Sequence, residues 1–186
     1  MTRNRFFATA AVLGLSAAAA YAANENPMVG GAPMFADKNI IENAVNSADH
    51  ETLVAAVKAA GLVETLQGEG PFTVFAPTDA AFGMLNEGAV EALLEPKAKA
   101  QLTQILTCHV VGADAMAAAI KGMIEDDGGM HVVPTLGGCM LKATYKGDKI
   151  MLEDERGQVI NVTIADVKQS NGVIHVVDRV ILPKAN

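Results

Sequence analysis

Residues 70–82 constrain the fold more than any other stretch of the chain. The residues between Pro71 and Pro77 are almost all β-branched, aromatic or small and apolar. This pattern predicts a short strand, buried on both faces and ended by proline. Thr78 or Asp79 can then accept hydrogen bonds from the free N–H groups at the start of a following helix. One segment therefore predicts a central strand, a sharp corner and a helix start.

The N-terminus has the pattern of a secretory signal peptide. Arg3 and Arg5 precede an apolar run over residues 6–20, and small residues follow as far as Ala22, where we expect cleavage. The alternative is an uncleaved membrane anchor, for which an apolar run of about 15 residues is short. We therefore expect residues 1–22 to be removed and the mature protein, without a membrane span, to reach a bacterial periplasm, the medium or the cell surface.

The charge balance of the mature chain argues against nucleic acid as a partner. Loss of Arg3 and Arg5 leaves 12 of the 14 Lys and Arg residues against 21 Asp and Glu, a net charge of 12 − 21 = −9. Such a surface repels phosphate, and the sequence has no cluster of basic residues to offset this. The chain has no Trp, and its few aromatic residues lie in core-like patterns, so stacking platforms for bases or sugars are not expected.

Both cysteines, Cys108 and Cys139, lie in the mature part of the chain. In an oxidising compartment an even pair favours a disulfide, and closing a loop of this length stabilises a domain by about 3 kcal/mol. Two free thiols are the alternative that the sequence leaves open.

The order of the patterns predicts an α+β fold. Residues 23–36 lack periodicity and predict a flexible lead-in to a single domain over residues 37–184. Helical patterns dominate up to residue 124, and short alternating strands separated by glycine turns dominate residues 131–182. We expect the helices to pack against an antiparallel-rich sheet system.

Three segments together resemble the fasciclin domain, an extracellular adhesion module. They are residues 70–82, 106–113 and 171–183, and the resemblance extends over roughly 39–183. It implies a wedge of two small β-sheets with the helices packed along one edge. The chain departs from the family pattern at Cys108, where an aromatic residue is usual.

The sequence lacks the side-chain constellations of an enzyme. Ser47 and Ser170 are the only serines after the signal peptide, and neither sits in a nucleophile turn. Cys108 and His109 are adjacent in an expected strand, so their side chains would leave opposite faces and could not form a catalytic pair. We therefore expect no catalysis.

No metal or cofactor site is expected either. Met116, Met123, Met130 and His131 could form a soft-ligand cluster for copper, but Met116 and Met123 share a helix face with Ile120, which favours core packing. The acidic turn at residues 125–128 lacks the alternating ligand spacing of a calcium loop.

Two histidines lie in valine-rich strand patterns and are expected in the core. For His109 the resemblance implies a hydrogen-bonded corner with Thr78 and Asp79, because it brings these segments side by side. His175 has the same pattern.

The expected function is therefore adhesion or protein interaction at a bacterial surface or in its matrix, by a monomer. Animal members of the family use Asp-Ile or Tyr-His segments, and here Cys108 replaces the aromatic half of the latter. The candidate contact residues, all from the third matching segment, are Asn171, His175, Asp178 and Arg179. The alternative is a periplasmic carrier or sensor that binds a small apolar ligand in a cleft beside the Met-rich helix at residues 113–124.

Overall fold

The computed structural model describes residues 26–185. The expected signal peptide at residues 1–22 and the first residues of the lead-in, 23–25, lie outside the described residues. In the part of the chain that is described, no helix is long and apolar enough to cross a membrane.

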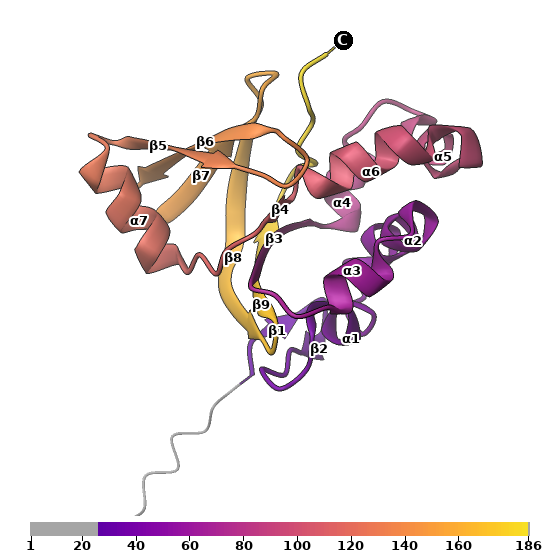
Figure 1. Cartoon of the computed structure of the whole chain (residues 1–186), viewed down its shortest axis with the longest axis horizontal. Coiled ribbons are helices and arrows are strands. Elements are labelled where there is room, and N and C mark those ends of the chain that lie inside the picture. Colours follow the sequence, from indigo (N-terminus) through magenta and orange to yellow (C-terminus); the bar gives the residue numbers. More distant parts are fainter. Residues whose placement is uncertain (1–25, 186) are drawn as a thin grey trace, which may run out of the picture.

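A seven-stranded mixed sheet runs through the molecule in the order β4-β3-β9-β8-β7-β6-β5 (Figure 1). Its strands are β3 (Phe72–Pro77), β4 (Val110–Val111), β5 (Met130–Pro134), β6 (Met140–Lys146), β7 (Lys149–Glu153), β8 (Val159–Gln169) and β9 (Gly172–Val177). A separate hairpin joins β1 (Met28–Val29) to β2 (Ala32–Pro33).

The helices form two groups on either side of the central strands. They are α1 (Ile40–Ala44), α2 (Glu51–Ala60), α3 (Val63–Gln67), α4 (Asp79–Gly83), α5 (Ala89–Leu94), the 3₁₀ helix Pro96–Ala98, α6 (Lys99–Thr107) and α7 (Ala117–Asp126). Helices α1 to α6 gather on one side of β3 and β9, whereas α7 lies apart from them beside β5, β6 and β7 (Figure 1). The predicted α+β class is confirmed.

Strand β8 belongs to both halves of the sheet. It pairs with β7 only from Met151↔Asn161 to Glu153↔Val159, and beyond that point it pairs with β9. Its register against β9 shifts twice between Val162 and Val167, and Asp166 within this stretch has a φ of 60°. Such irregularities bend a strand and increase its twist. The two small sheets expected for the wedge are therefore joined along one bent strand.

Strands β3 and β9 form a parallel pair that separates two hydrophobic cores. Val74 and Ala76 of β3 face the core built with α1 to α6. Phe75, between them, faces the second core, to which α7 contributes Ile120 and β6 contributes Leu141. Because successive side chains of a strand point to opposite faces, burial on both sides requires the nearly continuous apolar run seen in the sequence. The predicted central strand is confirmed.

The described part of the expected flexible lead-in is ordered, which corrects the sequence-based prediction. Val29 and Met34 are buried, with exposed fractions of 4% and 2%. The Asn43 side-chain amide accepts a hydrogen bond from the Phe35 N–H at 3.0 Å and donates one to the Phe35 carbonyl at 2.7 Å. Two apolar anchors and one buried amide thus hold a segment whose composition alone carries no periodic signal.

Candidate interaction surface

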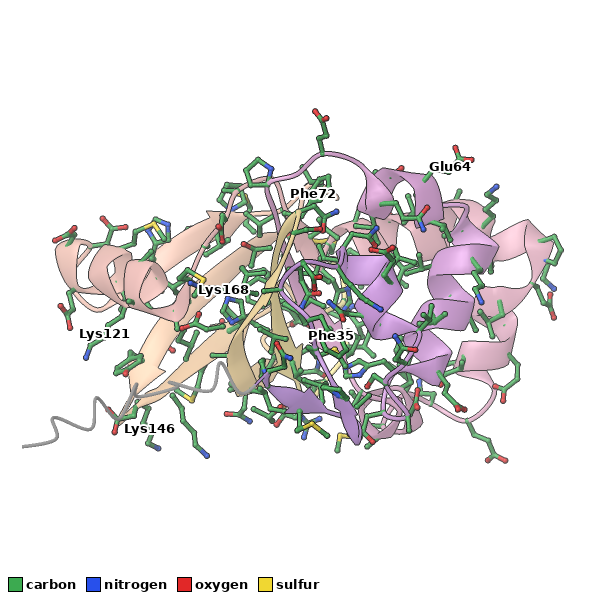
Figure 2. All side chains as sticks on the ribbon, turned by 90° about the horizontal axis from the view of Figure 1, so that it is seen from below. Phe35, Glu64, Phe72, Lys121, Lys146 and Lys168 are labelled. Carbon is green, nitrogen blue, oxygen red and sulfur yellow. A yellow bond between two sulfur atoms is a disulfide. The ribbon has the colours of Figure 1, made fainter. Side chains whose placement is uncertain are left out.

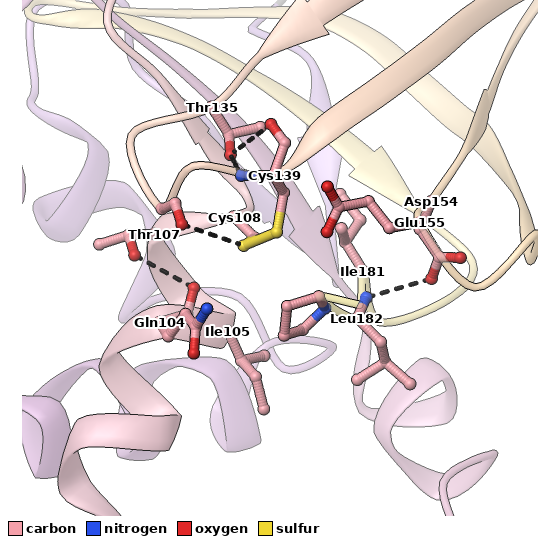
Figure 3. Close-up of a disulfide and its surroundings, with 12 residues drawn as sticks. Gln104, Ile105, Thr107, Cys108, Thr135, Cys139, Asp154, Glu155, Ile181 and Leu182 are labelled. Atoms are coloured by element: carbon pink, nitrogen blue, oxygen red, sulfur yellow. Dashed lines mark hydrogen bonds between the residues drawn. A yellow bond between two sulfur atoms is a disulfide. The ribbon is translucent and has the colours of Figure 1, made fainter. Parts of the chain in front are cut away.

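The disulfide between Cys108 and Cys139 connects the helical group to the strand group (Figure 3). Cys108 follows α6, Cys139 precedes β6, and their Cα atoms are 5.3 Å apart. The turn before Cys139 lies close to the helix end, because the Gly137 N–H donates to the Thr107 carbonyl at 2.9 Å. A Cβ at Gly137 would lie 2.6 Å from the backbone nitrogen of Cys108, so this approach requires glycine. Both sulfur-bearing residues are buried.

The corner after β3 caps two helices. The Thr78 hydroxyl accepts a hydrogen bond from the Ala81 N–H at 3.2 Å and so caps α4, as its position predicted. Asp79 instead turns toward α2, where its carboxylate accepts N–H bonds from Thr52 at 2.8 Å and from Glu51 at 3.3 Å. An acidic side chain at a helix start also interacts favourably with the helix dipole. Asp79 therefore fixes α2 to the end of the central strand.

His109 is not part of this corner, and the prediction that it bonds Thr78 or Asp79 is wrong. Its Nε2 accepts the Ile181 N–H at 2.9 Å, so Nδ1 carries the hydrogen and donates to the Ile105 carbonyl at 2.8 Å. The reason is local: His109 comes just after α6, where its ring reaches back to a carbonyl four residues earlier. Burial lowers the pKa of His109 to about 4, so the ring is neutral at pH 7.

The C-terminal segment after β9 is held by hydrogen bonds at two consecutive residues, first by His109 at Ile181 and then by Asp154 at Leu182. The Asp154 carboxylate accepts the Leu182 N–H at 3.1 Å (Figure 3). Val180 and Ile181 are buried although they form no strand. The chain after β9 is therefore ordered by side chains from the end of α6 and from the β7–β8 turn, and not by the strand expected at residues 180–182.

Two of the four candidate contact residues bind other parts of the chain. The Asn171 side chain accepts the Ile40 N–H at 3.1 Å and donates to the carbonyls of Leu66 at 2.8 Å and Gly68 at 2.9 Å. The Asp178 carboxylate accepts two hydrogen bonds from Asn161, one from its backbone N–H at 2.8 Å and one from its side-chain amide at 2.7 Å. Their polar atoms are already satisfied within the domain.

His175 is wholly buried, so the structure contradicts its assignment as a contact residue. Its Nδ1 accepts the Asp166 N–H at 3.2 Å, its Nε2 donates to the Ala115 carbonyl at 2.8 Å, and its ring stacks on Phe75. Burial lowers its pKa as well. Arg179 is half-buried, and no hydrogen bond or ion pair joins it to another described residue. The four residues thus do not form one exposed surface.

A different surface, which the sequence reasoning missed, exposes apolar side chains. We call it the outer face of β5–β8. It carries Met130, Val132, Met140 and Val159, with exposed fractions of 44%, 40%, 50% and 46%. Cross-strand pairing places Val132, Lys142, Glu153 and Val159 in one row, and Lys142 forms an ion pair of 2.7 Å with Glu153.

The alternation of strands β5 to β8 explains why this face is open. Val133, Leu141, Leu152 and Ile160 point to the opposite face and pack in the core under α7. Among the described residues, a helix covers that inner face and none covers the outer one (Figure 1). In these strands, residues that point into the core alternate with residues that point to solvent. The sequence has Met and Val at several solvent-facing positions, where Thr, Lys or Glu is usual, and this is the signal that could have identified the face.

Within residues 26–185, strand β5 forms the free edge of the sheet on this side, since it pairs there with β6 alone. Its residues are Met-His-Val-Val-Pro, and Lys, the residue that most often blocks edge pairing, is not among them. The His131 Nδ1 lies 2.6 Å from the carboxylate of Asp127 in the preceding turn. A sheet edge without lysine beside exposed apolar side chains is an arrangement to which an extended segment of another protein can bind.

Comparison with known proteins gives one consistent result. The family model of the Fasciclin domain matches residues 48–183. Protein sll1483 of Synechocystis is 47% identical over 144 residues, covering 77% of this chain and 73% of that protein. Immunogenic protein MPB70 of Mycobacterium bovis is 30% identical, covering 76% of this chain and 67% of that protein. A solved domain pair from the insect cell adhesion molecule Fasciclin I superimposes with a TM-score of 0.70 at 18% identity, covering 78% of this chain and 51% of that one.

Proposed function

The chain belongs to the fasciclin domain family, and we propose that it is an exported, non-catalytic module that binds a protein at a bacterial cell surface or in its matrix. The observation that carries this proposal is the outer face of β5–β8 next to the free edge of β5. The solved insect relative is named a cell adhesion molecule, and this chain shares its fold.

The apolar outer face is where a partner gains most from binding. Met130, Val132, Met140 and Val159 surround the Lys142–Glu153 pair on this face, and exposed apolar side chains gathered on one face favour an interaction site. The Lys142–Glu153 pair lies within this face and offers polar contacts that fix the register of a bound partner. A partner strand added to β5 would satisfy the backbone groups of the edge and place its own side chains beside Met130 and Val132.

Export is supported by two independent features of the chain. Residues 1–22 have the pattern of a signal peptide. The buried Cys108–Cys139 disulfide is of a kind that persists in oxidising compartments such as the periplasm and the extracellular space.

The absence of catalysis is part of the proposal and is supported by the histidines. Both ring nitrogens of His109 and of His175 bind backbone groups inside the domain. Burial lowers the pKa of both rings, which suits a neutral structural role. Neither ring is free to act as a general base toward a substrate.

The test is saturable binding of the labelled, oxidised mature protein to cells of its own source, with unlabelled protein as competitor. Met140→Glu places a charge on the outer face and should weaken binding by about tenfold or more, as a central interface substitution does. Met28→Glu is the matched control, because Met28 is also an exposed strand methionine, at 57% against 50%, but lies on the distant β1–β2 hairpin.

The proposal is overturned by either of two results. One is binding that does not saturate or is not competed. The other is an equal loss of binding in both variants while their thermal unfolding midpoints match that of the wild type. Retained binding in Met28→Glu with loss in Met140→Glu supports the outer face as the contact surface.

A further inference from the structure

A cleft of about 490 Å³ lies between α7 and the start of β7 and the bent part of β8. This volume is within the roughly 300–1,000 Å³ that small-molecule sites occupy. The cleft is at the opposite face of the sheet from the outer face of β5–β8, because its floor includes Ile150 and Val162, which belong to the core under α7. It is therefore a separate feature from the surface assigned to adhesion.

The topology of β8 explains why the cleft exists. Pairing between β7 and β8 stops at Met151↔Asn161, so Ile150 has no partner on β8. Beyond Asn161, β8 bends toward β9 through its two register shifts. The strands therefore separate at Val162, and the side chains of α7 that face the gap, Ala117 and Ala118, are too small to fill it.

The floor of the cleft is apolar. Ile150 and Val162 are buried, and Ala117, Ala118 and Ala165 add methyl groups to the walls. An alkyl chain placed here would remove apolar surface from water at about 25 cal/mol per Å². The sequence-based alternative expected methionines in a cleft beside this helix. The helix instead presents alanines and a lysine, while Met123 packs against the core.

The mouth of the cleft is positively charged within an acidic protein. The Lys121 ammonium lies 4.7 Å from the centre of the Tyr145 ring, and Lys149 lines the same opening. Lys146, the cross-strand partner of Lys149, lies at the same end of the molecule as Lys121 (Figure 2). Asp148 is the single acidic residue of the lining, so the lining carries one net positive charge, although the mature chain as a whole carries −9.

We propose that this cleft binds a single-chain amphiphile with an anionic head, of the class of a long-chain carboxylate. Its alkyl chain lies against Ile150, Val162 and the alanines, and its carboxylate lies at the mouth between Lys121 and Lys149. Lys121 is available for this because its only ion pair in the described chain, with Glu125, is long at 3.9 Å and exposed. This inference concerns a small molecule and does not depend on binding to cells.

Tyr145 makes the test specific to the site. The chain has no Trp and two tyrosines, of which Tyr21 lies in the expected signal peptide. In the mature protein, tyrosine fluorescence therefore reports on the cleft alone. We would titrate delipidated mature protein with dodecanoate, dodecanol and dodecyltrimethylammonium, each below its micelle concentration. We expect saturable binding of dodecanoate with an affinity roughly tenfold above that of the neutral and cationic probes.

Two variants and a control separate the head-group and tail contacts, with calorimetry as the readout because Lys121 itself affects Tyr145. Lys121→Gln combined with Lys149→Gln should abolish the preference for dodecanoate over dodecanol. Ala118→Leu narrows the cleft and should lower the binding affinity for all three probes. Lys97→Gln is the control, since Lys97 is an exposed lysine on the 3₁₀ helix of the other half.

Three results would overturn the proposal: no saturable binding of any probe, equal affinity for all three, or a dodecanoate preference that survives loss of both lysines. For the variants, a thermal unfolding midpoint equal to that of the wild type shows that the fold is intact. Loss of cell binding with retained dodecanoate binding would contradict the adhesion proposal alone.

Discussion

The two halves of the molecule, on either side of β3 and β9, are held together by different means. In the helical half, polar side chains bind the backbone of segments far away in sequence, as Asn171 does with α1 and the end of α3, and as Asp79 does with α2. In the strand half, β5 to β8 are held by regular pairing, a continuous apolar core and the disulfide. Both candidate binding features lie in the strand half, where the sheet is incompletely covered.

This difference suggests a division of roles. The helical half covers its side of the central strands and packs against them in one hydrophobic core. The strand half has one side of its sheet exposed and a gap where β8 leaves β7. Binding surfaces need groups that are not already satisfied within the fold, and the strand half is the one that provides them. Substitutions that act on one half at a time test this view.

The largest expected effect is from removing the disulfide. The double variant Cys108→Ala, Cys139→Ala should lose about 3–4 kcal/mol of unfolding free energy, because the bridge closes a long loop in the unfolded chain. Urea unfolding measures this loss. Amide hydrogen exchange should also accelerate more in β5 and β6 than in α2, because the bridge anchors the turn before β6 to α6. Equal acceleration in both halves would contradict the comparison.

Acid should destabilise the domain through its buried histidines. The folded pKa of His109 is lowered from 6.5 to about 4, so its contribution is complete above pH 6.5 and is lost progressively as the pH falls toward 4. The unfolding free energy decreases by about 3 kcal/mol over this range, because His109 binds a proton in the unfolded chain but not in the folded chain. His50 and His175, whose pKa values burial also lowers, act in the same direction.

Urea unfolding at pH 7 and pH 4.5 measures this dependence. The variant His109→Gln should be less stable at pH 7. Between these two pH values, however, its unfolding free energy should fall less steeply than that of the wild type. The slopes should differ by the contribution of one proton, about 1.4 kcal/mol per pH unit. If the slopes of variant and wild type are the same, His109 does not carry the effect.

A smaller loss is expected for Asn171→Ala, at about 2 kcal/mol, because three backbone groups lose a partner that is partly buried. Asn171→Asp is the matched control: it keeps the acceptor for Ile40 but turns a carboxylate oxygen toward the carbonyls of Leu66 and Gly68, which repel it, so its stability should be no higher than that of Asn171→Ala. Thermal or urea unfolding measures both. In Asn171→Ala, amide hydrogen exchange should accelerate first in α1 and α3, whereas in the disulfide variant it should accelerate more in β5 and β6.

The smallest effect is at the start of α2. Asp79→Ala removes the acceptor for two helix N–H groups and should cost about 1 kcal/mol, the usual value for an N-cap. Asp79→Asn keeps an acceptor and should cost less in the same urea unfolding measurement. A loss above about 3 kcal/mol for Asp79→Ala, beyond the usual range of an N-cap, would mean that Asp79 also supports the central strand.

The sequence predicted the parts of the fold whose cause is local. The apolar run of β3, the cap at Thr78 and the alternation of β6 and β7 are properties of consecutive residues, and each is found where it was expected. The ordered β1–β2 hairpin was missed because its order comes from Asn43 and from burial of Val29 and Met34, which are contacts across the chain.

The binding features were harder to predict for the same reason. Asn171 and His175 lie in a segment that matches the family, but a match to a family does not by itself assign a residue to function, and the polar atoms of these two bind groups within the domain. The open face of β5–β8 depends on which side of the sheet α7 covers. The cleft depends on where β8 leaves β7. Neither is encoded in the residues of a single segment.

The parallel pairing of β3 with β9 also has a consequence for how the chain reaches its native state. Phe75 pairs with His175, so these buried partners are 175 − 75 = 100 residues apart in sequence. Contacts of such separation form late and slow the folding of a domain. Until β9 has emerged from the ribosome, neither core can close, because both contain residues of β9. For the export proposed above, this late closure is favourable, because a chain whose central strand still lacks its parallel neighbour is not yet folded.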